Sequence, residues 1–203
     1  MANPCSTVIK FTSNDAAAVK KYYDSIIEYA GKDPSVTSVR LVTVLTNAGL
    51  NPDSYTHRGE IDYMELDENV CEICTETDWE PNIQMFLAIK DKLGLDLTLA
   101  FRAEEFGNNI AYIYDAAHTG LFPEEVYIDS YGDANGHDLD KINDYYDTSR
   151  AIDVLEPIFN IGSNSIDDYI DAAEAFNEEH EDEGDAYIGI HVFEYVNDLE
   201  GVL

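Results

Sequence analysis

Apolar and polar residues alternate in short β-rich segments, and segments with helical spacing lie between them. Thr7 to Phe11 is the first alternating segment and predicts a strand. A helix is predicted from Asn14 or Asp15 to about Ala30, because its apolar residues recur every three or four positions and Gly31 follows as a stop signal. Strands and helices mixed in this way indicate an α+β protein.

The same criteria predict further elements along the chain. Helices are expected from Ser35 to Gly49, from Pro81 to Gly94, from Ser149 to about Glu156, and from Ser165 to about Glu181. Strands are expected at Glu60–Leu66, Val70–Thr77, Leu95–Phe101, Ile110–Tyr114, Val126–Ile128 and Ala186–Val196, whereas Asp129 to Gly136 has loop chemistry. The predicted core includes Val8, Ile26, Ile83, Phe86, Leu97 and Leu99.

Charge restricts what a protein of this kind can bind. The chain holds 42 acidic residues against 11 basic ones, which gives a net charge of −31. The 53 residues after Arg150 contain 15 acids and no Lys or Arg. Such a field repels phosphate, so we expect no direct binding of nucleic acid and no binding to an anionic membrane. No run of 18 apolar residues suggests a membrane span, and Met1 to Ser6 lacks the pattern of a secretory signal.

Three segments carry a resemblance to a known family. Met1 to Ser6 looks like a short Asn-x-Cys-Ser strand, Thr75 to Pro81 looks like a strand-ending Thr-Ala-Trp-Ser-Pro-Pro motif, and Leu95 to Glu105 looks like a strand that ends in paired Glu. On these motifs, residues 1 to about 128 resemble the YubB-like ferredoxin-fold proteins, which are encoded on plasmids, phages and other mobile elements. The resemblance implies a ferredoxin-like antiparallel sheet with helices on one face and a mobile-element origin. It brings no strong catalytic role.

We therefore expect two parts in this chain. Residues 1–130 are expected to form the ferredoxin-like α+β domain. Residues 131–203 are expected to form an acidic α-α-β segment, packed on the first.

The cysteines and the acidic loop are the first candidates for metal or redox chemistry. Cys71 and Cys74 form a CxxC, but they lie in a predicted strand where a spacing of three places the two sulfurs on opposite faces. With Cys5 they make an odd count in a chain without an export signal, which favours reduced thiols and a cytoplasmic location in the host cell. The acidic run from Asp129 to Asp140 fails the EF-hand template at both anchors, so a looser Ca²⁺ site or a solvated loop remains open.

Other candidate groups favour structural roles. We expect Trp79 to pack against the sheet beside Pro81, with a recognition surface as the alternative. Close carboxylate pairs such as Glu104 and Glu105 are expected by chance in so acidic a chain. The histidines are scattered, and no nucleotide-binding motif is present. We therefore expect no catalytic residues, no metal and no cofactor.

The helix predicted from Ser165 is the most informative element. An apolar stripe lies along one side of it, and acids occupy the other. Like charges at a spacing of four destabilise a helix, and a basic partner would supply the missing cations. The alternative is a solvated face. The expected partner-binding residues are Asp167, Asp168, Asp171, Glu174, Glu178, Glu181 and Asp182.

These observations predict a binding protein rather than an enzyme. The leading hypothesis is an acidic DNA-mimic inhibitor from a phage or mobile element, which blocks the basic nucleic-acid channel of a host defence nuclease as an anti-CRISPR or anti-restriction protein. Its expected partner is a basic nucleic-acid-binding host protein, and a homodimer is a further option. The alternative is a salt-adapted or metal-binding acidic protein with an unrelated activity, enzymatic or other.

Overall fold

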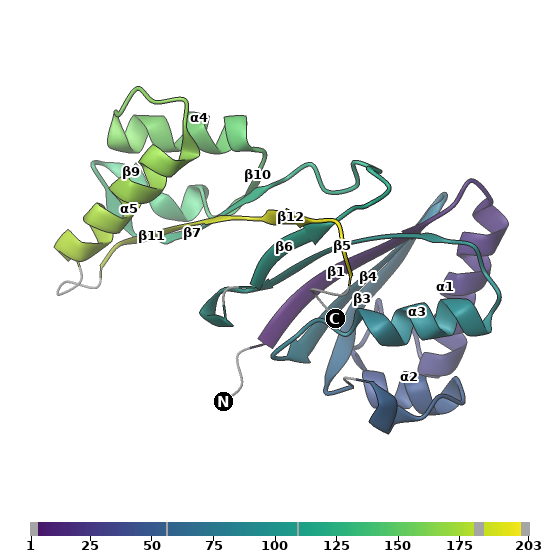
Figure 1. The fold of residues 1–203 in the computed structure, drawn as a ribbon. Coiled ribbons are helices and arrows are strands. Elements are labelled where there is room, and N and C mark those ends of the chain that lie inside the picture. The colour runs from purple at the N-terminus through teal and green to yellow at the C-terminus, as the bar shows by residue number, and fades with distance from the viewer. Residues whose placement is uncertain (1–3, 56, 109, 181–184, 200–203) are drawn as a thin grey trace. The chain divides into compact units, whose positions relative to one another are not determined.

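The chain folds into a mixed α/β structure with two compact units. A computed structural model describes residues 4–55, 57–108, 110–180 and 185–199. The first unit comprises Met1–Leu121 with Tyr195–Leu203, and the second comprises Phe122–Glu194. Figure 1 shows the helices and strands of each unit, and each unit has its own hydrophobic core. The expected boundary at 130/131 falls at the end of a strand that belongs to the second unit.

The first unit is built on one large, mostly antiparallel sheet. In the described residues its strand order is β12-β6-β5-β1-β4-β3-β2. The strands are β1 (Pro4–Thr12), β2 (Val39–Arg40), β3 (Gly59–Asp67), β4 (Val70–Asp78), β5 (Thr98–Glu105), β6 (Ile110–Tyr114) and β12 (Glu194–Val196). The helices are α1 (Ala16–Ala30), α2 (Leu41–Asn47), α3 (Ile83–Lys92) and the 3-10 turns η1 (Pro52–Ser54) and η2 (Phe106–Asn108).

Strand β1 lies at the centre of this sheet, between β4 and β5. Its alternate residues Cys5, Thr7, Ile9 and Phe11 are buried, and they join buried residues of α1, α2 and α3 in one core. The prediction that Val8 lies in the core is wrong, because a strand alternates its faces and Val8 points to the side away from this core. The other five predicted core residues are buried.

Local capping explains where α1 begins and ends. The side chain of Asp15 accepts a hydrogen bond from the backbone N–H of Ala17 at 3.0 Å, and Gly31 adopts the left-handed conformation that ends the helix. The helix expected from Ser35 is wrong in its first turn. The Asp33 carboxylate accepts hydrogen bonds from the backbone and hydroxyl of Ser35, which fixes a turn, and α2 begins only at Leu41.

The second unit packs two helices against a small antiparallel sheet. The sheet order is β10-β7-β11 among the described residues, and α4 and α5 share its core. The elements are β7 (Val126–Tyr131), β8 (Asp133–Ala134), β9 (His137–Asp138), η3 (Leu139–Lys141), β10 (Asp144–Tyr146), α4 (Thr148–Phe159), α5 (Ile166–His180) and β11 (Tyr187–Val192).

The loop expected at Asp129 to Gly136 is only partly a loop. Strand β7 continues to Tyr131, and β8 and β9 form a tight hairpin. Asn135 and Gly136 both have positive φ at its tip, as an Asn-Gly turn between paired strands requires.

Among the described residues, none of the helices combines the length and the apolar character that a membrane span needs.

Gly59 lies where β3 and β4 approach each other closely. A Cβ at this position would lie 2.2 Å from the backbone oxygen of Glu76, whereas a Cβ at Gly94 would meet nothing within 4 Å. Both glycines have positive φ. We expect Gly59→Ala to lower the free energy of unfolding by about 2–4 kcal/mol, and Gly94→Ala by about 1 kcal/mol. Urea unfolding measures both, and equal losses would contradict the close approach.

Candidate functional site

The acids predicted on the last long helix lie on the exposed side of α5. Tyr169 and Ala173 are its buried residues, and Ile166 and Phe176 pack partly against the core. We define the α5 acidic face as its exposed predicted acids: Asp167, Asp168, Asp171, Glu174 and Glu178. The other two predicted residues, Glu181 and Asp182, lie outside the described residues.

Two polar side chains hold α5 in place. Tyr169 is fully buried, and its hydroxyl donates to Glu156 Oε2 on α4 at 2.5 Å and to the Ser163 carbonyl at 3.1 Å. Asn177 bonds both backbone groups of Ile188 on β11, donating at 2.7 Å and accepting at 2.9 Å. Because both contacts come from the core side of the helix, the acidic face is presented on a fixed support.

Opposite charge is scarce around this face. In sequence, the unit from Phe122 to Glu194 holds 21 acidic residues and two basic ones, Lys141 and Arg150. Lys141 pairs with Asp138 at 3.0 Å. None of the described residues forms an ion pair with the α5 acidic face, although the Ser163 hydroxyl donates to Asp168. No basic side chain among the described residues therefore offsets the charge of this face.

The three cysteines are free and poorly suited to chemistry. The prediction for the CxxC is confirmed: Cys71 is buried on the helix side of β4, whereas Cys74 is half-buried on the opposite side. Burial raises the pKa of the Cys5 and Cys74 thiols to about 11, and it raises the pKa of Cys71 further. These thiols are protonated at neutral pH, which disfavours both nucleophilic and metal-binding roles.

The other candidate metal-binding and catalytic residues lie in different elements of the structure. Asp129 lies within β7, and Asp133 accepts a hydrogen bond from the backbone N–H of Gly136 inside the hairpin. No three His, Cys, Asp or Glu side chains gather as metal ligands among the described residues. Glu104 and Glu105 are neighbours on β5, so they face opposite sides of the sheet, and only Glu105 is buried.

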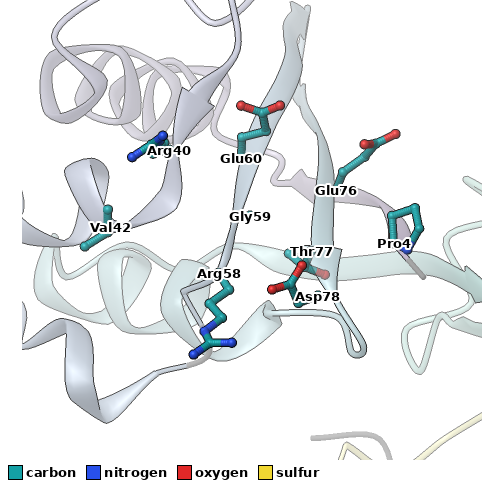
Figure 2. A pocket seen from close by; sticks show the side chains of 9 residues that line it. All are labelled: Pro4, Arg40, Val42, Arg58, Gly59, Glu60, Glu76, Thr77 and Asp78. Carbon is teal, nitrogen blue, oxygen red and sulfur yellow. The ribbon is translucent and has the colours of Figure 1, made fainter. Parts of the chain in front are cut away.

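A cavity that sequence reasoning missed lies at the end of the first unit's sheet. It measures about 430 Å³, and β1, β2, α2, β3 and β4 all contribute to its lining. Figure 2 shows two arginines, Arg40 and Arg58, and three carboxylates, Glu60, Glu76 and Asp78, around it, and the backbone N–H of Asp78 donates to the Arg58 carbonyl at 3.1 Å. Neither arginine forms an ion pair within the described residues. We call this the β2–β4 cavity; at its β1 side, Pro4 is paired with Asp78.

The side chain of Trp79 corrects another expectation. It is 54% exposed, so the prediction that it packs against the sheet is wrong. Its backbone has φ of +75°, in the left-handed region, at the turn between β4 and α3. Pro81, which we expected beneath the indole, is buried without it.

Two arrangements are thus available for binding: the α5 acidic face and the β2–β4 cavity with its mixed charges. Comparison with protein-family models, curated proteins and solved structures found no match for this chain. The chemistry of these sites is therefore inferred from their own residues.

The hydrogen bond between Tyr169 and Glu156 should make the stability of the protein depend on pH. Hydrogen bonds from the Tyr169 hydroxyl and from backbone N–H groups lower the pKa of Glu156 below its ordinary value of 4.5. A lowered folded-state pKa contributes stability above the ordinary pKa, and that contribution is lost as the pH falls through the folded-state value. Tyr169→Phe should therefore lower Tm most at neutral pH, and its effect should shrink toward pH 3.

The control for this prediction is Tyr29→Phe. The Tyr29 hydroxyl has no hydrogen-bond partner among the described residues, so this variant should show no pH-dependent difference from the parent protein. Thermal unfolding followed by circular dichroism measures both variants. A loss for Tyr169→Phe that is equal at pH 7 and pH 3 would show that the hydroxyl does not act through the ionised carboxylate.

Proposed function

We propose that this chain is an acidic inhibitor that binds a basic nucleic-acid-binding protein of the host cell through the α5 acidic face. Its target would be the DNA or RNA channel of a host defence nuclease, as for anti-restriction and anti-CRISPR proteins. The observation that carries this proposal is the exposure of five acids on one side of α5 without an ion pair in the described residues. The proposed protein is not an enzyme and acts in the cytoplasm of the host cell.

The spacing of the charges supports mimicry of nucleic acid. Asp171, Glu174 and Glu178 are three and four residues apart, so successive carboxylates rise by about 5 Å along the helix. DNA presents one phosphate per roughly 3.4 Å of axis on each strand. The two charge ladders have similar spacing, and a channel lined with Lys and Arg can engage either one.

Repulsion among the acids of α5 favours binding of a basic partner. Acids at spacings of three or four destabilise an isolated helix by a few tenths of a kcal/mol per pair. A basic channel removes that repulsion and also steers the acidic protein toward itself from a distance. The support from Tyr169 and Asn177 means that the charges need not be ordered at the moment of binding.

The strand order of the first unit supports the finer fold assignment. Strands β1, β3, β4 and β5 with helices α1 and α3 follow one another as β-α-β-β-α-β, apart from the short β2 and α2. In the sheet these four strands are ordered β5-β1-β4-β3. We propose that this part of the chain is ferredoxin-like and, from the resemblance of its motifs, that it comes from a mobile element.

Charge reversal tests the proposed face. We expect Asp171→Lys with Glu174→Lys and Glu178→Lys to fold as the parent does, because all three side chains are exposed. Capture of host proteins on the immobilised parent protein identifies the partner. Its affinity for the triple variant should fall by about 100-fold or more at low salt, because each contact becomes a repulsion. Added salt should weaken the parent complex.

The matched control changes the net charge equally but elsewhere. Glu28, Asp53 and Asp96 are exposed acids of the first unit without ion pairs among the described residues. Reversing these three to Lys should leave the affinity within a few-fold of the parent value. If the two triple variants lose affinity equally, net charge alone governs binding. If the α5 variant binds as tightly as the parent, the α5 acidic face is only solvated.

A further inference from the structure

The small sheet of the second unit carries aromatic rings on the face away from its helices. Helices α4 and α5 share a core with Val126, Ile128 and Ile188 of this sheet. Because a strand alternates its faces, the residues between these buried ones point to the opposite side. There they form three cross-strand pairs, which we call the β7–β11 face: Tyr131 with Tyr187, Asp129 with Gly189, and Tyr127 with His191.

Stacked rings lie at both ends of this face, with a carboxylate between them. The ring centroids of Tyr131 and Tyr187 are 5.8 Å apart with an interplanar angle of 23°. Those of Tyr127 and His191 are 6.1 Å apart at 18°. Asp129 lies between the two ring pairs in the register of the strands. Positions two apart on a strand are separated by about 7 Å, so a group bound to Asp129 has aromatic rings close by on either side.

The middle of the face is open because one of its positions is a glycine. A Cβ built on Gly189 would lie 2.7 Å from the Tyr187 hydroxyl oxygen and 3.1 Å from His191 Nε2, so both side chains lean over this glycine toward Asp129. Burial, and then the charge of Asp129, raise the pKa of Tyr187. Burial lowers the pKa of His191 below 6.5 against the opposing charge of Asp129, so the imidazole is neutral at pH 7 and does not compensate the carboxylate.

These groups fit a cation that also donates hydrogen bonds. The Asp129 carboxylate only accepts, and it forms no ion pair within the described residues. The Asn143 amide is 3.5 Å from its Oδ1, at the limit of a hydrogen bond, which leaves most of its acceptor capacity unused. The unit holds 21 acids against two bases and therefore attracts cations. A guanidinium has five N–H donors in one plane and stacks on aromatic rings, whereas an ammonium is a hydrated point charge.

We propose that the β7–β11 face binds the guanidinium group of an arginine side chain from a partner protein. Asp129 accepts hydrogen bonds from the guanidinium, and the rings of Tyr187 and Tyr127 cover it from the two ends of the face. This surface rests on its own observations. It lies on the opposite side of the sheet from α5 and does not depend on the function proposed for that helix.

Titration followed by NMR tests this surface, because each backbone amide reports on its own surroundings. The probe is a blocked Gly-Arg-Gly peptide at about 150 mM salt, which screens unspecific attraction. Its twins carry lysine, or citrulline, which is uncharged and nearly isosteric, in place of arginine. We expect the arginine peptide to shift the amides of Asp129 and Gly189 saturably, the lysine peptide to bind more weakly, and the citrulline peptide to have no effect. Equal binding of the citrulline peptide, or shifts spread over the acidic surface of the chain, would overturn the proposal.

A matched pair of variants separates recognition from charge. Asp129→Asn should lower the affinity for the arginine peptide by about tenfold. Asp144→Asn removes the same charge from the same sheet, but Asp144 pairs with the buried Ile128 and so points to the other side; its affinity should stay within about twofold of the parent value. Tyr187→Leu removes a ring from an edge strand and should weaken binding by about three- to fivefold, which keeps the test open if Asp129→Asn does not fold. Equal losses in the two Asp variants, or full affinity in folded Tyr187→Leu, would contradict the proposal.

The triple α5 variant distinguishes this surface from the one proposed above. Asp171→Lys with Glu174→Lys and Glu178→Lys should leave the arginine-peptide affinity of the β7–β11 face within about twofold of the parent value, because none of these residues belongs to that face and salt screens their charge. Loss of the response in that variant would show that the peptide senses only the overall charge of the protein. That result would overturn this surface without bearing on the function proposed for α5, which is measured with the captured partner.

Discussion

Repulsion among uncompensated carboxylates is the constraint on which the rest of this structure depends. A net charge of −31 comes from 42 acidic residues and 11 basic ones, so most carboxylates of the chain have no basic side chain to pair with. The two cores are correspondingly apolar, and the acids stay at the surface with few exceptions. One exception, Asp115, accepts hydrogen bonds from Thr119 and from the backbone N–H of Gly120, which stabilise its buried charge. Burial of apolar surface must therefore offset a repulsion that ion pairs do not relieve.

In α5, repulsion between carboxylates is large and the buried apolar surface that offsets it is small. Its acids repel one another, and its buried side rests mainly on Tyr169 and Ala173. The hydrogen bonds of Tyr169 and Asn177 fix the helix to α4 and β11 despite that repulsion. A basic partner would lower the energy of this helix more than that of a neutral one, which links the cost in folding to the proposed function.

Sequence patterns predicted the elements whose signals are local. Capping by Asp15 and Gly31 placed α1, and strand alternation separated Cys71 from Cys74. Spacing also placed the acids of α5 on its exposed side. The failures come from competing or nonlocal interactions. Hydrogen bonds from Ser35 to Asp33 replaced the first turn of a helix, and the Asn135-Gly136 turn was a hairpin signal that the acidity of its surroundings obscured.

The candidate sites show the same division. Burial of Trp79 was expected from its residue type, but the outcome depends on a left-handed backbone that no periodicity encodes. The β2–β4 cavity brings Arg40 and Arg58 together with residues of β4, which are distant in sequence and meet only through strand pairing. The acidic face was predictable because it lies within one helix. Its proposed function depends on a partner, so binding to that partner is the most direct test.

That measurement is competition between the protein and nucleic acid for the captured partner. A labelled 20-base-pair duplex is bound to the partner, and the acidic protein is added at low and at high salt. The account predicts full displacement of the duplex at low salt, with weaker displacement as salt screens the charges. If the partner holds the duplex and the acidic protein together at both salt concentrations, mimicry of nucleic acid by α5 is contradicted.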